Sequence, residues 1–281
     1  MRDNSSRFAV PDEEPVEAAE QPKITDLMSF AAPTQFVDLP SGGKWYPPGH
    51  PLHGESSIEI KFMTAKEEDI LASQELIKKG VVLDRLIQSI IVDKRLKPDD
   101  LLVGDKAAIM YAARISAYGP EYNTKFFCRG CSTPVKHTFD LEEITLKEEP
   151  DLEELGATEE DGLFTITLPV TKAEVVLKLM NGKDEKQMAK FIQKQKKNNS
   201  GVGALTTQML FVVQSINGIS GKAQIMHFIE NMPFKDSKHL RSTYNQLSPS
   251  MNTKFEISCG ECFTEQEVEL PMSVEFFWPN Q

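Results

Sequence analysis

Cysteine is scarce in this 281-residue chain. There are four, and they fall into two Cys-x-x-Cys pairs, unlike the scattered cysteines of a disulfide-stapled secreted protein. Hydrophobic runs long enough to span a bilayer are missing. The first residues have no positively charged start leading into an apolar core, so we expect no signal peptide. These absences favour a protein that is made and assembled in a reducing cytosol.

Sequence motifs of common catalytic sites are absent as well. The chain has no Gly-x-Ser-x-Gly elbow, no His-Glu-x-x-His and no dinucleotide fingerprint. The closest histidines, His50 and His53, stand in a proline-rich loop with no acidic third ligand beside them. The stretch 41–44 (Ser-Gly-Gly-Lys) is not a phosphate loop, because Trp45 follows where such a loop needs Ser or Thr. We therefore expect no enzymatic activity.

The four cysteines are spaced to hold one metal ion. Cys128 and Cys131 form the first pair, and Cys259 and Cys262 form the second. A Cys-x-x-Cys turn brings two sulfurs close enough to share a cation, and two such turns complete a closed Cys₄ shell. Structural zinc is the expected ion, and iron in the same geometry is the less favoured alternative. His137 could replace a cysteine, but we interpret it as an ordinary strand residue.

Each cysteine pair stands between two short stretches of strand-like alternation. These stretches cover 123–127 and 133–139 around the first pair, and 252–258 and 264–270 around the second. The pattern predicts two β-hairpins, each with a metal knuckle at its tip. Unliganded buried cysteines or a redox pair are the alternatives. A redox Cys-x-x-Cys normally opens a helix, and no helical pattern follows either pair.

The rest of the chain predicts a helical block and an inserted α+β segment. Residues 64–67 form a capping box that marks a helix start, and an apolar stripe predicts a second helix over 81–92. A third helix is expected over 106–118, capped by Asp105. Paired strands are expected at 163–168 and 174–180, and helices at 184–197, 204–216, 222–231 and 235–246. Helix 204–216 is apolar nearly all round and is expected in the core.

Together these elements predict an α+β fold in which a helical block and two zinc-ribbon-like β-hairpins share a Cys₄ site. We expect a flexible acidic tail over 1–34 and a single body over 35–281, with metal knuckles at 128–131 and 259–262. Segment 140–161 holds eleven acidic residues and one lysine, a net charge of −10 out of −11 for the chain. We interpret it as a solvated, mobile arm with a helical turn at 151–155, in preference to a docking site for a basic partner.

Zinc ribbons often bind nucleic acid, so a nucleic-acid-binding or regulatory protein is the alternative function. Such a protein needs a cationic surface, because counterion release supplies much of its affinity. The basic residues around the hairpins are offset by five glutamates, which argues against this function. Those basic residues are Lys125, Arg129, Lys136 and Lys254. The aromatic stretch 274–279 is expected to pack within the chain, with docking to a neighbour as the alternative.

Several short motifs follow one another in a recognisable order. They are residues 39–46, the capping box at 64–67, Leu83–Leu86, Leu101–Asp105, Tyr118–Tyr122, the paired cysteines and Phe276–Pro279. Over about 36–279 this order resembles the baseplate hub assembly proteins of T-even-like bacteriophages. The metal site is inferred from cysteine spacing alone.

The resemblance implies a function, partners and a location for the chain. The function would be to build the central hub of the contractile tail's baseplate, as an assembly factor or minor hub subunit without enzymatic chemistry. The partners would be other baseplate or hub proteins, with no nucleic acid. The location would be the host cytoplasm during assembly and the tail baseplate in the virion.

Overall fold

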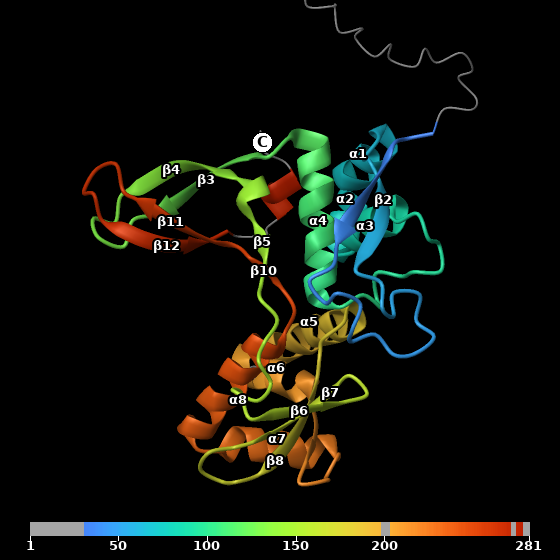
Figure 1. Cartoon of the computed structure of the whole chain (residues 1–281). Helices are drawn as coiled ribbons and strands as arrows, with labels where there is room; N and C mark the ends of the chain where they lie inside the picture. The colour runs from blue at the N-terminus through green and yellow to red at the C-terminus, as the bar shows by residue number, and fades with distance from the viewer. Residues whose placement is uncertain (1–30, 198–202, 271–273, 278–281) are drawn as a thin grey trace, which may run out of the picture. The chain divides into compact units, whose positions relative to one another are not determined.

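Helices and small antiparallel sheets make up the described part of the chain, as the sequence patterns predict. The computed structural model describes residues 31–197, 203–270 and 274–277, which are coloured in Figure 1. Residues 32–281 form one unit. The tail expected over 1–34 lies outside the described residues except for its last four, and Thr34 already belongs to a strand. Within the described ranges no helix is both long and apolar enough to cross a bilayer.

Residues 31–120, which are the described part of the chain before the first hairpin, form a two-stranded sheet and four helices. Strand β1 (Thr34–Asp38) pairs antiparallel with β2 (Ser57–Lys61). The helices are α1 (Ala65–Ala72), α2 (Gln74–Lys79), α3 (Val82–Ile90) and α4 (Val103–Tyr118). The predicted capping box starts α1, because the Thr64 amide donates to the Glu67 carboxylate at 3.0 Å and the reciprocal contact is also made. The apolar stripe of α3 faces the core.

The start of α4 differs from the prediction. Leu102 is the N-cap, so Asp105 lies inside the first turn and does not cap the helix. Its carboxylate is fully buried and accepts hydrogen bonds from the amide and hydroxyl of Ser41 (2.9 and 2.7 Å) and from the hydroxyl of Tyr46 (2.7 Å). Burial raises the pKa of Asp105, although these hydrogen bonds oppose the rise. Asp105 therefore fastens the 41–46 loop to α4.

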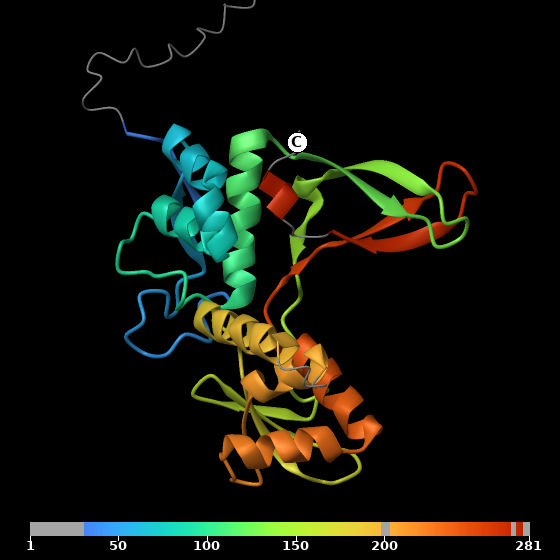
Figure 2. The same ribbon diagram turned by 180° about the vertical axis from the view of Figure 1, so that it is seen from behind.

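Both predicted hairpins are present. The first pairs β3 (Glu121–Phe127) with β4 (Pro134–Asp140), and the second pairs β11 (Lys254–Ser258) with β12 (Glu265–Glu269). The two hairpins lie side by side in both views (Figures 1 and 2). Two short strands, β5 (Thr145–Leu146) and β10 (Met251–Asn252), also pair and connect the hairpins to the segment inserted between them.

In its described residues, the inserted segment is an antiparallel sheet with four helices. The sheet order is β6 (Ala157–Glu160), β7 (Leu163–Thr167), β8 (Glu174–Lys178) and β9 (Val213–Ile216). The helices are α5 (Gly182–Lys197), α6 (Ala204–Val212), α7 (Lys222–Asn231) and α8 (Phe234–Leu247). The prediction of one helix over 204–216 is wrong at its end, because residues 213–216 pair with β8. Leu205 is 56% exposed, so α6 is not buried all round.

The acidic segment 140–161 contains regular elements. It holds the 3-10 helix η2 (Leu141–Glu143), strand β5 and the whole of strand β6, which is an edge strand of the inserted sheet. All eleven acidic side chains are exposed, as expected of a solvated segment. The predicted turn at 151–155 is confirmed by a hydrogen bond from the Leu155 amide to the Asp151 carbonyl (3.2 Å) and by Gly156 at φ 60°. Leu141 and Ala157 anchor the segment in the core.

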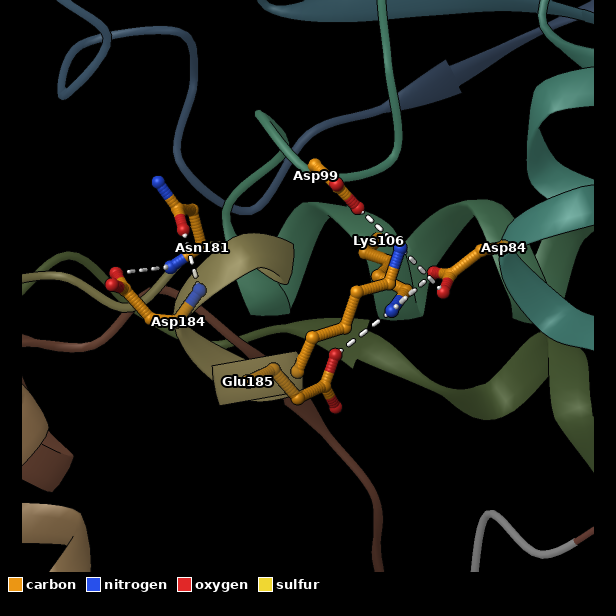
Figure 3. A network of polar contacts seen from close by, with 7 residues as sticks. Asp84, Asp99, Lys106, Asn181, Asp184 and Glu185 are labelled. Atoms are coloured by element: carbon orange, nitrogen blue, oxygen red, sulfur yellow. Dashed lines mark hydrogen bonds and ion pairs between the residues drawn. The ribbon is translucent and has the colours of Figure 1, made fainter. Parts of the chain in front are cut away.

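An ion-pair network joins the helical block to the inserted segment (Figure 3). The ammonium of Lys106 on α4 lies 2.9 Å from Asp84 on α3 and 2.8 Å from Glu185 on α5. Lys186, also on α5, reaches the other oxygen of Asp84 at 2.9 Å and pairs with Asp99. Glu185 and Lys186 thus meet three charged partners from the helical block. The network fixes α5 against α3 and α4.

Candidate metal centre

The four cysteines come together at the tips of the two hairpins. Their sulfur atoms all lie within 4.8 Å of one another. The Sγ atoms of Cys128 and Cys262 are 3.6 Å apart, and those of Cys131 and Cys259 are 3.8 Å apart. A tetrahedral ion with metal–sulfur bonds of about 2.3 Å separates its sulfurs by about 3.8 Å. The arrangement therefore fits one shared metal ion, and all four cysteines are free thiols.

The backbone of the first knuckle is a closed turn. The Cys128 amide donates to the Thr133 carbonyl at 3.0 Å, and the Ser132 amide donates to the Cys128 carbonyl at 2.8 Å. The Gly130 amide points at the Cys128 sulfur at 3.3 Å. An amide aimed at a sulfur stabilises the thiolate form, which is the form that binds metal. The Gly130 amide thus favours the thiolate of Cys128.

The second knuckle repeats this geometry. The Cys259 amide donates to the Thr264 carbonyl at 3.0 Å, and the Phe263 amide donates to the Cys259 carbonyl at 2.9 Å. Phe263 and its counterpart Ser132 have nearly the same left-handed backbone, with φ of 57° and 58°. Similar local sequences have therefore produced two similar knuckles that face each other.

Hydrogen bonds and neighbouring sulfurs give the cysteines different pKa values. The hydroxyl and amide of Thr264 lower the pKa of Cys262 to about 6, and those of Thr133 lower the pKa of Cys131. For Cys128 the Cys131 amide acts in the same direction, but burial and the neighbouring sulfurs outweigh it and raise the pKa to about 11. Four thiolates cannot gather without a compensating charge. A bound cation would supply that charge and would hold its thiol ligands in the deprotonated form.

Contacts between the hairpins extend beyond the sulfurs. The Arg129 amide of the first knuckle donates to the side-chain carbonyl of Gln266 on β12 at 2.8 Å, and Gln266 is buried. The rings of Phe139 and Phe255 pack edge to face with centroids 4.9 Å apart. The sequence reasoning missed Gln266. The sequence feature that could have indicated it is a polar residue at a position of β12 whose side chain faces inward.

His137 is an ordinary strand residue, as interpreted from the sequence. Its ring packs edge to face against Phe139 at 4.6 Å and stands 6.5 Å from Phe126. Among the described residues the only grouping of possible metal ligands is the four cysteines, and His137 is not part of it. The candidate shell is therefore made of sulfur alone.

A comparison with protein families identifies the chain. The family model described as T4 bacteriophage base plate protein matches residues 32–278. The chain belongs to this family. Searches of curated proteins and of solved structures gave no match. The resemblance drawn from short motifs is thus confirmed at the level of a T4-like baseplate protein, with a structural role in the phage tail.

The proline-rich loop of the baseplate protein uses its histidines for packing. His50 stacks on Tyr46 with ring centroids 4.4 Å apart, and its Nδ1 accepts a hydrogen bond from the Leu52 amide at 3.2 Å. The Nδ1 of His53 lies 2.6 Å from the Tyr46 carbonyl oxygen. Each ring thus has a contact within its own loop. In the described part of the chain, neither histidine belongs to a group of possible metal ligands.

The aromatic residues near 276 pack within the baseplate protein, as expected. Phe276 and Phe277 are 0% and 1% exposed. The Arg114 guanidinium donates to the Phe276 carbonyl at 2.9 Å, and the rings of Tyr111 and Tyr122 meet Phe276 edge to face at 5.1 and 5.2 Å. The remainder of the predicted cluster, from residue 278, lies outside the described residues.

Proposed function

We propose that this baseplate protein acts in assembly of the central hub of the phage tail baseplate. It works without enzymatic chemistry, as an assembly factor or minor hub subunit, through contacts with other baseplate or hub proteins. It acts in the host cytoplasm during assembly, and the tail baseplate is its place in the virion. Membership of the baseplate family supports this proposal, as does the order of motifs shared with hub assembly proteins.

In this proposal Cys128, Cys131, Cys259 and Cys262 hold one structural zinc ion. The distances between sulfurs of opposite knuckles are those expected of a tetrahedral Cys₄ shell. Such a shell is closed and leaves no position for water or substrate, so the ion supplies cross-linking and not catalysis. Zinc is preferred to iron because a structural tie needs no redox chemistry.

The observation that carries the proposal is that the sulfur contacts bridge two distant parts of the chain. The first hairpin precedes the inserted segment and the second hairpin follows it. A metal ion between them closes the chain around that segment, while β5 and β10 pair at its base. The result is a rigid body whose outer surfaces keep fixed positions for partners, which is what an assembly protein requires.

Interruption of the gene in the phage tests the hub role. We expect infected cells to accumulate baseplate parts that lack the central hub, visible by electron microscopy, and we expect the intact gene in trans to restore them. A tagged chain should co-purify with hub or baseplate proteins. Normal hub-bearing baseplates from the interrupted phage would overturn the proposal.

Nucleic-acid binding remains a second candidate because the first hairpin has a basic outer side. Lys125 and Lys136 lie directly opposite each other in the β3–β4 ladder, and Arg129 is exposed beside them. The adjacent β11–β12 hairpin opposes this charge with Glu256 and Glu267, which are also paired across the ladder. We expect no gel shift with DNA or RNA at low salt. Tight, salt-sensitive binding without any tail partner would favour the second candidate.

A further inference from the structure

The tip of the paired hairpins carries two exposed phenylalanines. Phe127 immediately precedes Cys128 and is 74% exposed, and Phe263 immediately follows Cys262 and is 79% exposed. The sulfurs of these two cysteines are 3.6 Å apart, so both aromatic residues belong to the same end of the hairpin pair. We call Phe127 and Phe263 the aromatic tip.

Phe263 stands in a backbone conformation that does not suit it. A φ of 57° lies in the left-handed region, which is unfavourable for a bulky side chain. The equivalent position in the first knuckle is occupied by the much smaller Ser132. Burial of the ring would offset the strain, but the ring is almost fully exposed in the single chain. Its apolar surface is therefore available to something outside the chain.

The inserted segment carries an apolar pocket at a different place on the same chain. The pocket has a volume of about 450 Å³ and lies between α7 and the end of β9. Its apolar lining consists of Ile216, Ile219, Ile225, Phe228, Met232 and Pro233. Phe234, which follows this lining in sequence, is 76% exposed, and Ile219 is 48% exposed. Exposed apolar patches of this kind are typical of protein interaction sites.

We propose that the protein self-associates head to tail, with the aromatic tip of one copy inserted into the apolar pocket of a second copy. The pocket has the size and lining that suit aromatic side chains, which are frequent anchors of protein interfaces. Charges near the two surfaces are complementary in part. Glu261 and Glu265 flank Phe263, Lys172 follows the pocket residue Thr171, and Lys235 follows Phe234 just after the pocket residue Pro233.

The charge balance around the pocket still favours an acidic partner surface. Lys222 begins α7 and adds a third exposed cation near the pocket, while Glu174 and Glu230 offset part of the positive charge. The tip adds Arg129, which partly offsets its glutamates. We therefore expect apolar contact to supply most of the affinity and charge to influence its orientation.

A contact between two different surfaces has a consequence for assembly. The pocket of the first copy and the tip of the second copy remain free, so further copies can add until a ring closes or a filament grows. This self-association goes beyond the proposed hub role and does not depend on it. A monomeric protein could still co-purify with hub proteins, so each proposal can fail alone.

Size-exclusion chromatography with light scattering of the metal-loaded protein tests the inference. We expect the mass of the natural protein to rise with concentration above that of a monomer. A tip variant (Phe127→Thr with Phe263→Asn) and a pocket variant (Ile219→Ser with Phe234→Ser) should each stay monomeric. Phe36→Ser is the control, because Phe36 is 73% exposed on β1 and belongs to neither surface. It should associate like the natural protein.

A mixture of the two variants is the sharper experiment. The pocket variant has an intact tip and the tip variant has an intact pocket, so the mixture should form a dimer and stop there. Asn tolerates a left-handed backbone, so the melting temperature of Phe263→Asn should equal or exceed that of the natural protein, which excludes unfolding as the reason for lost association. A natural protein that stays monomeric at every concentration, or a mixture without dimers, would overturn the inference.

Discussion

Thr264 lies where a side chain at Gly130 would begin. A Cβ added to Gly130 would be 2.5 Å from the Thr264 hydroxyl oxygen and 3.1 Å from its Cβ. The two knuckles therefore approach each other so closely that one of them requires glycine. This contact joins one of the two residues between the first cysteine pair to the second residue after the other pair, and both belong to the surroundings of the candidate ion.

Gly130→Ala should weaken the metal centre. The added methyl group forces the two knuckles apart, and overpacking of this kind costs about 1–3 kcal/mol. We expect a lower melting temperature and faster loss of metal to a competing chelator. Gly260→Ala is the matched control in the second knuckle, because a Cβ there meets no atom within 4 Å. Equal behaviour of the two variants would contradict the close knuckle contact.

Asp236→Asn should destabilise the inserted segment. The Asp236 carboxylate on α8 is buried and accepts hydrogen bonds from the amides of Val170 (2.7 Å) and Thr171 (2.9 Å). Asn offers one acceptor oxygen in place of two and loses the charge, so we expect a loss of about 2 kcal/mol in the free energy of unfolding. Chemical denaturation measures it. The exposed Asp69→Asn on α1 should change stability little.

The stabilisation from Asp236 should disappear in acid. Burial raises the pKa of Asp236, but the amide hydrogen bonds of Thr171 and Val170 outweigh burial and leave it lowered. A carboxyl whose pKa is lower in the folded state stabilises above its unfolded pKa of about 3.9 and loses that effect as pH falls through the folded value. The difference between the natural protein and Asp236→Asn should therefore be largest near neutral pH. A difference that grows in acid would contradict this assignment.

Lys106→Met should loosen the inserted segment from the helical block. Lys106 is 11% exposed and bridges Asp84 and Glu185, and the change leaves Asp84 with Lys186 alone. Removal of one partner from a buried ion pair costs about 3 kcal/mol. Lys79→Met, which breaks the exposed pair with Glu75, should cost less than about 1 kcal/mol. Thermal unfolding compares the two, and similar losses would contradict a structural role for the network.

Removal of the metal ion should destabilise the two hairpins earlier than the inserted segment. The sheet β6–β9 carries buried apolar residues such as Phe164, Ile166 and Val175 and does not contain the cysteines. A chelator should therefore increase amide hydrogen exchange first in β3, β4, β11 and β12. Re-addition of zinc should restore protection. Uniform exchange changes across the chain, or none, would show that the cysteines do not hold the hairpins together through an ion.

Local patterns were sufficient to predict the hairpins and the start of α1. The Cys-x-x-Cys spacing constrains the sulfurs through ligand chemistry, and the Thr64 capping box is complete within four residues. Asp105 could not be assigned in this way. Its role depends on Ser41, whose position beside α4 is set by the fold and not by neighbours in sequence. The same holds for Gln266, whose partner Arg129 belongs to the other hairpin.

The end of the predicted helix over 204–216 shows a second limit of local patterns. Apolar residues run through Val212 and Val213, so a buried helix and a buried strand look alike there. Pairing of β9 with β8 decided in favour of the strand. The net charge of segment 140–161 was an equally poor guide to its structure. Its carboxylates are exposed, but Leu141 and Ala157 are buried and attach the segment to the rest of the protein.

The metal content of the purified chain tests the central claim most directly. The protein should be prepared without chelator under reducing conditions, and its zinc and iron measured by elemental mass spectrometry together with the number of thiols that react under native conditions. We expect one zinc ion per chain and four protected thiols, with loss of zinc in Cys128→Ser. A chain with neither zinc nor iron and four reactive thiols would contradict a metal tie between the two hairpins.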